Sequence, residues 1–364
     1  MPPHLPLPFP PEKLELGQIL ALVGRANACL ARYDGLLESL VNPDVLLSPL
    51  LMKEAELSSR IEGTIATANE VYQRQAGEEF EPEKNADIAE IINYQRTLRS
   101  ASEEIKDKTI SLHMIRQMHG ILMQGVRGES KNPGKFRTTQ NWIGSKGCEQ
   151  KDATYVPPAP TKVDELLDGL IDYISNENPE FDPIVQTALM HAQFELIHPF
   201  DDGNGRIGRL LIPLYLAQRK CLVGPSLYVS SYLETHRDEY YAALKEISAS
   251  GDWMGWIRFF IEAIIVQANA NLTLVRNVKT LYETKKYELT ALLRTDQAIH
   301  ILDMLFDTPV FRGADVHNRL GIQRQRAAGY IRSLKEAQVI TELRPPRGRR
   351  AALLYFGDLF DITG

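Results

Sequence analysis

One stretch decides the fold and function expected of this chain, and it runs His198-Pro199-Phe200-Asp201-Asp202-Gly203-Asn204-Gly205-Arg206-Ile207-Gly208-Arg209. Glycines flank Asn204, so the backbone can adopt left-handed dihedrals and bring its N–H groups close to an anion. The apolar run that follows predicts a helix that begins near Asn204 or Gly205. The first turn of a helix offers unpaired N–H donors and the positive end of the helix dipole to phosphate oxygens. The stretch therefore predicts a phosphate site.

The side chains of this stretch add a base, a metal ligand and two cations. His198 is the side chain whose unperturbed pKa suits proton abstraction near neutral pH. Asp202 can hold a hard Mg²⁺ ion that also binds substrate phosphates. Arg206 and Arg209 are three residues apart, so both guanidinium groups can grip phosphate oxygens from the first turn. Each feature alone is more often structural, but the combination predicts a nucleotide, a metal ion and a deprotonated nucleophile.

The stretch matches neither the P-loop nor the dinucleotide-binding glycine loop. It resembles the H-x-F-x-[DE]-G-N-G-R-x-x-R signature of Fic-domain proteins at every specified position. The resemblance implies an all-α Fic fold with a small β-hairpin flap. It also implies a protein adenylyltransferase, which moves AMP from ATP to a Tyr, Thr or Ser hydroxyl of a protein target, releases pyrophosphate and can modify itself. His198 is then the catalytic base and Asp202 the Mg²⁺ ligand, and the residues that bind the nucleotide are Gly203, Asn204, Gly205, Arg206, Ile207, Gly208 and Arg209.

A second motif lies ahead of the first. Ser48-Pro49 predicts a helix start, with a capping serine before proline, and places Ser58 and Glu62 one turn apart on one face. Such a pair is more often an ordinary polar surface. The sequence S-S-R-I-E-G of residues 58–63, however, resembles the [ST]-x-x-x-E-[GN] inhibitory motif of Fic proteins, in the class whose inhibitory helix precedes the catalytic domain. The inhibitory residues are then Ser58, Glu62 and Gly63.

In this interpretation Glu62 pairs with Arg209 and takes the place of the γ-phosphate. ATP then enters only in a pose that misaligns its α-phosphate for in-line attack. A misplacement of about 1 Å can cost on the order of 100-fold in rate. The resting state expected from the sequence is therefore the inhibited one.

Two further regions are expected near the site. Short aromatic and β-branched pieces between residues 132 and 160 suggest a β-hairpin or an irregular loop, and Fic proteins carry a hairpin flap here. Candidates for bonding a target peptide along its main chain, with a buried structural role left open, are Trp142, Ile143 and Gly144. Tyrosines after the core motif line the adenine and ribose pocket of the family, which points to Tyr232, Tyr240 and Tyr241. Aromatic packing is an equal alternative for each.

Other histidines are expected to be structural. His113 and His119 are six residues apart and do not share a helix face, so we expect packing or surface positions for both. His191 lies seven residues before His198. A second catalytic histidine is conceivable there, but a hydrogen-bonded core histidine is the better interpretation.

Composition places the chain among ordinary globular proteins. It has 364 residues, of which 44% are hydrophobic and 24% charged, enough for two or three domains. Cys29, Cys148 and Cys221 are scattered and form no metal or disulfide pattern, as in a reducing cytosol. We found no signal peptide and no apolar stretch long enough for a bilayer, so a cytoplasmic location without membrane contact is expected. The proline-rich first eleven residues predict an extended arm, either a packing strap or a loose tail.

The C-terminal part has a different charge. The net charge of −6 conceals a basic segment between residues 310 and 350, where three acids face ten basic residues: Arg312, Arg319, Arg324, Arg326, Arg332, Lys335, Arg344, Arg347, Arg349 and Arg350. Helices expected at 298–306, 313–320 and 323–337, followed by alternating residues around a basic loop, have the order of a winged helix-turn-helix. Its basic third helix predicts nucleic-acid contact through phosphates. A protein-docking or dimerisation module, with a homodimer, is an equal alternative.

The expected organisation is a Fic_N-like helical region at 1–105, a catalytic core at 106–275, a connector helix at 276–295 and a winged-helix domain at 296–364. The expected function is an autoinhibited adenylyltransferase with ATP and Mg²⁺. Alternatives are a nucleotide-sensing transcription regulator and an enzyme that removes AMP with Glu62 orienting water. The intact His198 favours an enzyme, because a sensor needs the phosphate grip but no general base.

Overall fold

The two helices on either side of the core motif form the centre of the fold. The computed structural model describes residues 2–126, 131–145, 147–177, 180–348 and 350–363. α7 (Pro183–Ile197) and α8 (Asn204–Gln218) pack against each other, and nearly all of their residues are buried. An all-round apolar helix belongs in a core. The motif between them is therefore anchored on two buried helices.

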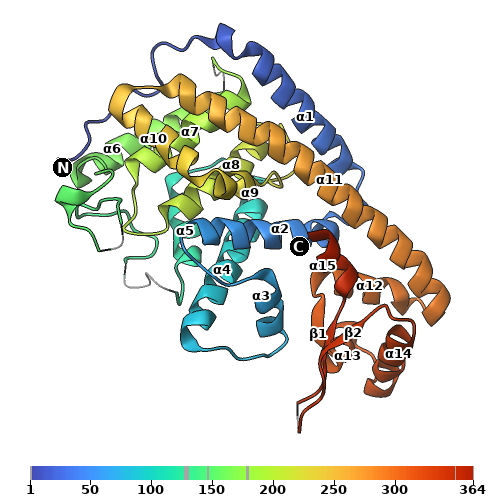
Figure 1. The fold of residues 1–364 in the computed structure, drawn as a ribbon. Helices are drawn as coiled ribbons and strands as arrows, with labels where there is room; N and C mark the ends of the chain where they lie inside the picture. Colours follow the sequence, from blue (N-terminus) through green and yellow to red (C-terminus); the bar gives the residue numbers. More distant parts are fainter. Residues whose placement is uncertain (1, 127–130, 146, 178–179, 349, 364) are drawn as a thin grey trace.

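Helices from both sides of the sequence surround this pair (Figure 1). They are α1 (Leu20–Glu38), α2 (Pro43–Ile61), α3 (Ala68–Gln75), α4 (Pro82–Glu104), α5 (Leu112–Leu122), α6 (Val163–Ser175), α9 (Ser230–Thr235), α10 (Arg237–Ser250) and α11 (Trp253–Leu293). Short 3₁₀ turns occupy Leu16–Gln18, Gln150–Asp152 and Pro160–Lys162. The expected predominance of helix in this part of the chain is confirmed.

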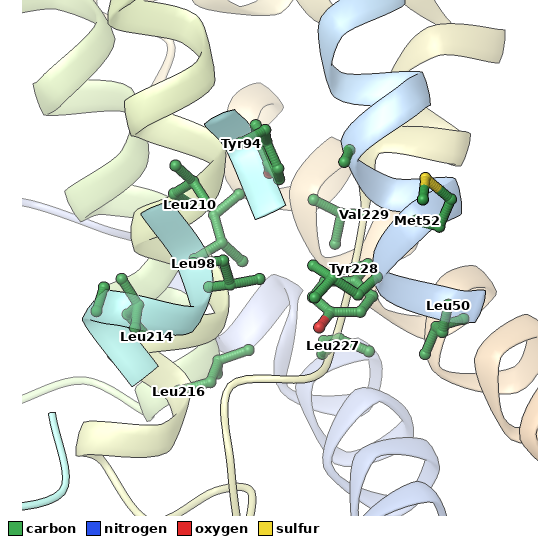
Figure 2. Close-up of a cluster of buried hydrophobic side chains, with 14 of the residues drawn as sticks. Leu50, Met52, Tyr94, Leu98, Leu210, Leu214, Leu216, Leu227, Tyr228 and Val229 are labelled. Atoms are coloured by element: carbon green, nitrogen blue, oxygen red, sulfur yellow. The ribbon is translucent and has the colours of Figure 1, made fainter. Parts of the chain in front are cut away.

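A hydrophobic cluster fixes α2 against α8 (Figure 2). The cluster combines side chains from α2, α4, α8 and the segment before α9. Those labelled in the figure are Leu50, Met52, Tyr94, Leu98, Leu210, Leu214, Leu216, Leu227, Tyr228 and Val229. Each large apolar side chain that leaves water in this way contributes about 2 kcal/mol. The position of α2, which carries Ser58 on its inner side, is thus set by packing.

The start of α2 differs from the sequence expectation. The helix begins at Pro43, with Asp44 in its first turn, and Pro49 lies inside it. Pro43 is as good a first helical residue as Pro49, and Ser48 donates its hydroxyl to Asp307 at 3.4 Å instead of capping. The prediction of a start at Ser48 was wrong because two adjacent proline signals compete.

The N-terminal arm is a packing strap. The backbone N–H of His4 donates to the carbonyl of Val156 at 2.8 Å. The ring of Phe9 meets Tyr173 edge-on at 4.8 Å between centroids and Trp253 at 6.1 Å. Of the two possibilities left open by the prolines, the strap is the one observed.

The expected β-hairpin flap is less regular than predicted. In the described part of residues 131–160, one antiparallel bridge joins Ile143 to Tyr155, with an N–H···O distance of 2.8 Å, and no strand is assigned. Glycines follow the bridge on one side, and Pro157 and Pro158 follow it on the other. A proline has no N–H to donate to a ladder, so pairing stops after one step.

α11 runs through both the expected core and the expected connector, and the boundary at residue 275 falls inside it. Among the described residues it is the one helix long and apolar enough to cross a bilayer by length and composition, where the sequence predicted none. Half of that apolar window is buried inside the protein. In Figure 1 α11 links the core to the C-terminal part.

The C-terminal part combines helices with a small sheet. Its elements are α12 (Gln297–Asp307), β1 (Val310–Arg312), α13 (Gly313–Leu320), α14 (Arg324–Glu336), β2 (Thr341–Arg344), β3 (Leu353–Tyr355) and α15 (Gly357–Thr363). The three strands form an antiparallel sheet in the order β1-β3-β2, with Phe311 opposite Leu354. The three expected helices are present at their expected places, whereas β1 and α15 were not foreseen.

Candidate active site

The end of α7 positions His198. The residue adopts a left-handed conformation (φ 50°, ψ 59°), and its N–H donates to the carbonyl of Phe194 at 3.0 Å. Nδ1 lies 3.3 Å from the carbonyl oxygen of Glu195. A neutral ring that donates from Nδ1 keeps Nε2 as a proton acceptor. Burial lowers the pKa of His198 to about 4, against the opposing effects of the Glu195 carbonyl and of Glu62, so the ring is neutral at pH 7.

Arg137 joins the end of α7 to the flap loop. Its guanidinium donates to the carbonyls of His198 at 2.9 Å, Ile197 at 3.3 Å and Pro158 at 2.6 Å, and its side chain is almost fully buried. Buried carbonyls at a helix end need such partners. No sequence pattern singled out Arg137, because its partners are backbone atoms as far as 61 residues away in the chain.

Asn204 and His119 hold the loop between α7 and α8. The side-chain amide of Asn204 accepts from the N–H of Phe200 and donates to its carbonyl, both at 2.8 Å. The ring of His119 stacks on Phe200 with 3.8 Å between centroids, and its Nε2 lies 3.0 Å from the carbonyl oxygen of Asp202. Burial lowers the pKa of His119 to about 4, so it is the packing histidine that was expected. Since the Asn204 amide is engaged with the loop, its contribution to an anion site comes from the backbone.

α8 begins without a side-chain cap. Its N-cap residue, Gly203, has φ 77°, and a Cβ there would meet Sδ of Met123 at 3.0 Å and the ring of His119 at 3.6 Å. Both the backbone and the available space therefore require glycine at this position. The uncapped first turn leaves N–H donors for an anion, as the sequence predicted.

An ion pair connects α2 to the core motif. Arg209 is 1% exposed and donates from one terminal nitrogen to Oε1 of Glu62 at 2.7 Å and to the carbonyl of Ser58 at 2.9 Å. Its Nε donates to the hydroxyl of Ser58 at 2.8 Å. One planar guanidinium thus holds both residues with charge-assisted bonds. The pairing expected between Glu62 and Arg209 is present.

The Glu62 carboxylate rests on the N-terminus of α8. A Cβ at Gly205 would clash with Oε1 of Glu62, so the carboxylate lies directly against the Gly205 backbone. Burial alone would raise the pKa of Glu62, but the guanidinium groups of Arg209 and Arg206 outweigh it and hold the pKa below its ordinary value. A carboxylate therefore occupies the place where the sequence predicted a phosphate.

Gly63 ends the helix that carries this carboxylate. It has φ 94°, a conformation that suits glycine, and its N–H donates to the carbonyl of Arg60 at 2.9 Å. Glu62 is the last residue before this turn and its side chain is 33% exposed. The role of Gly63 is thus to stop α2 at the residue that bonds Arg209.

Arg206 is buried, and some of its N–H donors have no acceptor among the described residues. Its NH1 lies 3.4 Å from Oε2 of Glu90 and its NH2 3.8 Å from Oδ1 of Asp202. Its Nε and NH1 have no hydrogen-bond acceptor among the described residues. A buried guanidinium with unmet donors beside a helix start suits an anionic ligand.

Asp202 is the accessible carboxylate beside the start of α8. Its side chain is 46% exposed, and Oδ1 accepts from the N–H of Gly203 at 2.6 Å. The described residues contain no group of three or more His, Cys, Asp or Glu that could hold a metal by themselves. A single accessible carboxylate beside an anion site fits Mg²⁺, which uses one or two carboxylates together with water and phosphate oxygens.

Comparison with known families identifies the chain. Residues 20–103 match the family described as Fic/DOC family N-terminal, and residues 109–216, which include the core motif, match the Fic/DOC family. The two matches together cover more than half of the chain. The chain belongs to the Fic/DOC family. The prediction made from the core motif and the 58–63 motif is confirmed at this level.

Relatives of this Fic/DOC chain carry the name protein adenylyltransferase. It is 32% identical over 174 residues to protein adenylyltransferase fic-1 from Caenorhabditis briggsae, a match that covers 47% of this chain and 31% of that protein. It is 27% identical over 173 residues to protein adenylyltransferase Fic from Nematostella vectensis, covering 47% and 36%. The chain thus spans about a third of the length of these relatives.

Solved structures share the Fic/DOC fold seen here. A Fic family protein from Desulfovibrio desulfuricans is similar over 98% of both chains with a TM-score of 0.60 and 20% identity. Fic-1 from Caenorhabditis elegans is similar over 73% of this chain and 75% of its own, with a TM-score of 0.55 and 21% identity. At these identities the likeness establishes the fold.

The tyrosines of this Fic/DOC chain lie in different surroundings. Tyr240 is buried, and its hydroxyl lies 3.0 Å from Nε2 of His191. Tyr241 is 41% exposed, and its hydroxyl senses the charges of Glu62 and Arg209. The ring of Tyr232 instead stacks on His236, and burial together with the charges of Glu262 and Glu239 raises its pKa. The charges of Glu62 and Arg209 also affect the pKa of Tyr240, so Tyr241 differs from it in being exposed, while Tyr240 is packed against His191.

Ile207 and Gly208 face the core. Ile207 is fully buried, and the carbonyl of Gly208 lies 3.0 Å from Nδ1 of His191. Burial lowers the pKa of His191 to about 3, so His191 is the hydrogen-bonded core histidine that was expected. A Cβ at position 208 would clash with the Glu195 carboxyl, so this glycine lets α7 and α8 approach.

The flap residues are partly exposed, as a docking edge requires. Trp142 is 41% exposed and donates its indole N–H to the carbonyl of Cys148 at 2.9 Å, while Ile143 is 37% exposed. A Cβ at Gly144 would meet Sγ of Cys148 at 2.5 Å, so glycine is needed there for space. The single backbone bridge of Ile143 pairs it with Tyr155 of the same loop.

Two carboxyl groups near the site were missed by the sequence interpretation. Glu195 has an Oε1 without a hydrogen-bond partner among the described residues, and burial raises its pKa to about 8. Glu54 is 4% exposed on α2, and burial raises its pKa to about 7. A signal existed for Glu54, since it lies one turn before Ser58 on the buried side of an apolar helix. Glu195 had none, because its environment is set by α8 and α10.

Proposed function

We propose that this Fic/DOC chain transfers AMP from ATP to a hydroxyl group of a protein, and that it rests in an inhibited state. The observation that carries the proposal is the Glu62 carboxylate bound to Arg209 on the N-terminus of α8, beside an intact His198. A built-in carboxylate in an anion site competes with a phosphate for the same donors. The name of the relatives supplies the class of reaction.

The chemical step needs a base, and His198 provides it. Its Nδ1 faces the Glu195 carbonyl, so Nε2 takes the proton of the incoming hydroxyl. The hydroxyl oxygen then attacks the α-phosphorus, the bond from that phosphorus to the bridging oxygen of the β-phosphate breaks, and pyrophosphate leaves. Arg206, Arg209 and the first-turn amides of α8 hold the β- and γ-phosphates in line. Asp202 would hold Mg²⁺, which supplies positive charge to the phosphates when bound.

Inhibition follows from competition for Arg209. While Glu62 holds this guanidinium, the γ-phosphate loses its strongest partner and meets a negative charge instead. ATP can still bind through the remaining contacts, but its α-phosphate is out of line with the hydroxyl that His198 activates. Loss of alignment, more than loss of affinity, is the expected consequence.

The position of the AMP can be tested by isotopic label. Glu62→Gly protein is incubated with Mg-ATP carrying ³²P at the α- or the γ-position, and the protein is precipitated and counted. We expect label from the α-position only, and none when His198→Ala is added to the same background. Label retained from the γ-position would mean phosphoryl transfer and would overturn the proposal.

The remaining parts of the proposal extend to partners. A target protein would add its main chain to the exposed edge near Ile143 and present a hydroxyl to His198. Residues 296–364 would be a winged helix-turn-helix, an assignment supported by the order of α12, α13 and α14 and by the turn at Gly321, where φ is 62°. Removal of AMP, nucleotide-sensing regulation, a homodimer and a cytoplasmic location stay predictions from the sequence.

A further inference from the structure

The arginines of the C-terminal part divide into two groups. Those of the first group are paired within the molecule: Arg312 and Arg344 both bond the buried carboxylate of Glu78, the latter at 2.8 Å, and Arg319 bonds Asp307 at 2.8 Å. The Glu78 pairs join the C-terminal part to the segment after α3, and the Asp307 pair joins α13 to α12. Their charge is therefore used within the molecule.

The second group is exposed and has no ion pair with any carboxylate in the part of the chain that the structure describes. It consists of Arg324, Arg326 and Arg332 on α14 and of Arg347 and Arg350 in the β2–β3 loop. Two of the nearby acids are engaged elsewhere: Asp315 accepts from the backbone N–H of Arg312 at 2.7 Å, and Glu342 is paired with Lys335. Glu336, at the end of α14, is one exposed carboxylate against five exposed arginines. A local excess of positive charge remains on a protein whose net charge is −6.

The outer face of α14 is shaped for close approach. Ala327 and Leu334 are its buried residues, and at 100° per residue the opposite side is formed by Gln325, Gly329 and Arg332, with Glu336 at the C-terminal end of the same face. A Cβ added at Gly329 would meet nothing within 4 Å, so no contact within the molecule requires glycine there. Glycine inside a helix is less favourable than alanine, because its backbone loses more conformational freedom on folding. Its bare surface permits a partner to approach the helix backbone.

We infer that the outer face of α14, together with the β2–β3 loop, binds duplex DNA. Arginines on both sides of the first turn and in the loop would contact phosphates, which supply most of the affinity. The outward side chains of Gln325 and Arg332 can reach base edges, since Gln pairs with adenine and Arg with guanine in the major groove. That groove is about 12 Å wide and admits an α-helix.

Charge and shape favour duplex DNA over a protein partner or duplex RNA at this surface. A protein partner for five unpaired arginines would have to be strongly acidic, and the rest of the described C-terminal surface offers no apolar patch to go with them. Duplex RNA has a deep, narrow major groove that a helix cannot enter. In a DNA duplex, the phosphates can pair with the arginines, and the wide major groove can admit the face of α14 around Gly329.

The test measures fluorescence anisotropy of a fluorescein-labelled 24-base-pair duplex of mixed sequence, titrated with full-length His198→Ala protein at several NaCl concentrations. This background separates DNA binding from catalysis, so the outcome is independent of the proposed AMP transfer. We expect micromolar or tighter binding at 50 mM NaCl, and a plot of log K against log salt with a slope steeper than about −3. No binding at 50 mM NaCl, or tighter binding of a duplex RNA of the same sequence, would refute the inference.

Two sets of variants, each with its own control, test whether DNA binds at this surface. Removing the three α14 arginines, as Arg324→Ala with Arg326→Ala and Arg332→Ala, is expected to weaken binding more than about 10-fold and to flatten the salt slope by 2 to 3. The matched control removes three exposed cations elsewhere, as Lys13→Ala with Arg25→Ala and Arg276→Ala, and should change little. Equal effects of the two triple variants would show a non-specific contact and overturn the assignment.

The second set of variants tests whether the face of α14 around Gly329 lies against DNA. Gly329→Gln adds bulk where the structure has open space, so the helix should be as stable as before or more so, while DNA affinity should fall about 10-fold. Gly329→Ala, with one added methyl group, is the control and should retain most of the affinity. If Gly329→Gln binds DNA as well as the control does, α14 does not lie in the groove and the inference fails.

Discussion

At the scale of residues, the core motif mixes groups for a ligand with groups for the loop itself. Arg209 bonds the Glu62 carboxylate, which lies against the Gly205 backbone, and the side chain of Asn204 bonds the backbone of Phe200. The sequence showed which residues belong together, because their spacing is local. It did not show which way each side chain points, because that depends on partners such as Arg137 and His119 elsewhere in the chain.

Asn204→Ala should destabilise the protein. Two hydrogen bonds to the Phe200 backbone are lost and both groups are left buried, which costs about 2 kcal/mol in the free energy of unfolding. Asn204→Asp keeps the acceptor for the Phe200 N–H but not the donor for its carbonyl, so it should fall between. Chemical denaturation of the three proteins measures this order. An alanine variant as stable as wild type would mean that the side chain does not hold the loop.

At the scale of elements, α2 is held by packing and by a buried carboxyl group. Oε1 of Glu54 accepts from the Ser230 hydroxyl at 2.6 Å and from the Tyr94 hydroxyl at 2.9 Å, so α2 is tied to α9 and α4. The helices were predictable from their apolar periodicity, and α13 and α14 agree closely with expectation. The start of α2 was predicted wrongly, because two proline signals compete. Of the two possibilities left open for the flap, a β-hairpin or an irregular loop, the irregular loop with one bridge is the one observed.

The Glu54 link should depend on pH. Its folded pKa of about 7 lies above the ordinary carboxyl value because burial favours the neutral form, so the folded state retains a proton that the unfolded state has lost. The stability it contributes is therefore complete below the unfolded pKa and declines as pH rises through about 7.

Glu54→Gln cannot ionise and should abolish this decline. Between pH 5 and pH 8 the wild type should lose about 2 kcal/mol of unfolding free energy relative to the variant. Denaturation of both proteins at each pH gives the difference directly. If the difference in unfolding free energy between the two proteins stays constant across this pH range, the pKa of Glu54 does not change on folding.

At the scale of the whole molecule, contacts between residues far apart in sequence connect the segment that follows Glu62 to the C-terminal part. Glu78, just after α3, receives Arg312 and Arg344, and the ring of Tyr72 on α3 meets Phe360 edge-on at 5.9 Å. The segment that follows Glu62 is thus held between the core and the C-terminal part. No sequence pattern indicates such a contact, since its partners are more than 230 residues apart.

Glu78→Gln should loosen the C-terminal part selectively. The change leaves the half-buried guanidinium of Arg312 without its counter-charge, which costs about 2 kcal/mol, less than for a fully buried pair because two backbone carbonyls still accept from Arg312. Hydrogen exchange followed by mass spectrometry should show faster exchange in β1 and α13, with α7 and α8 unchanged. The exposed neighbour Glu79→Gln is the control. Equal exchange in both variants would exclude a clamp at Glu78.

The contact that joins all three scales is the ion pair between Glu62 and Arg209. Its most direct test is the initial rate of self-labelling from α-³²P-ATP, compared between Glu62→Gly and wild type at the same Mg-ATP concentration. If the carboxylate holds the place of the γ-phosphate, the variant should label at least about 10-fold faster, within the range that lost alignment can cost. A variant that labels no faster than wild type would contradict the inhibited resting state.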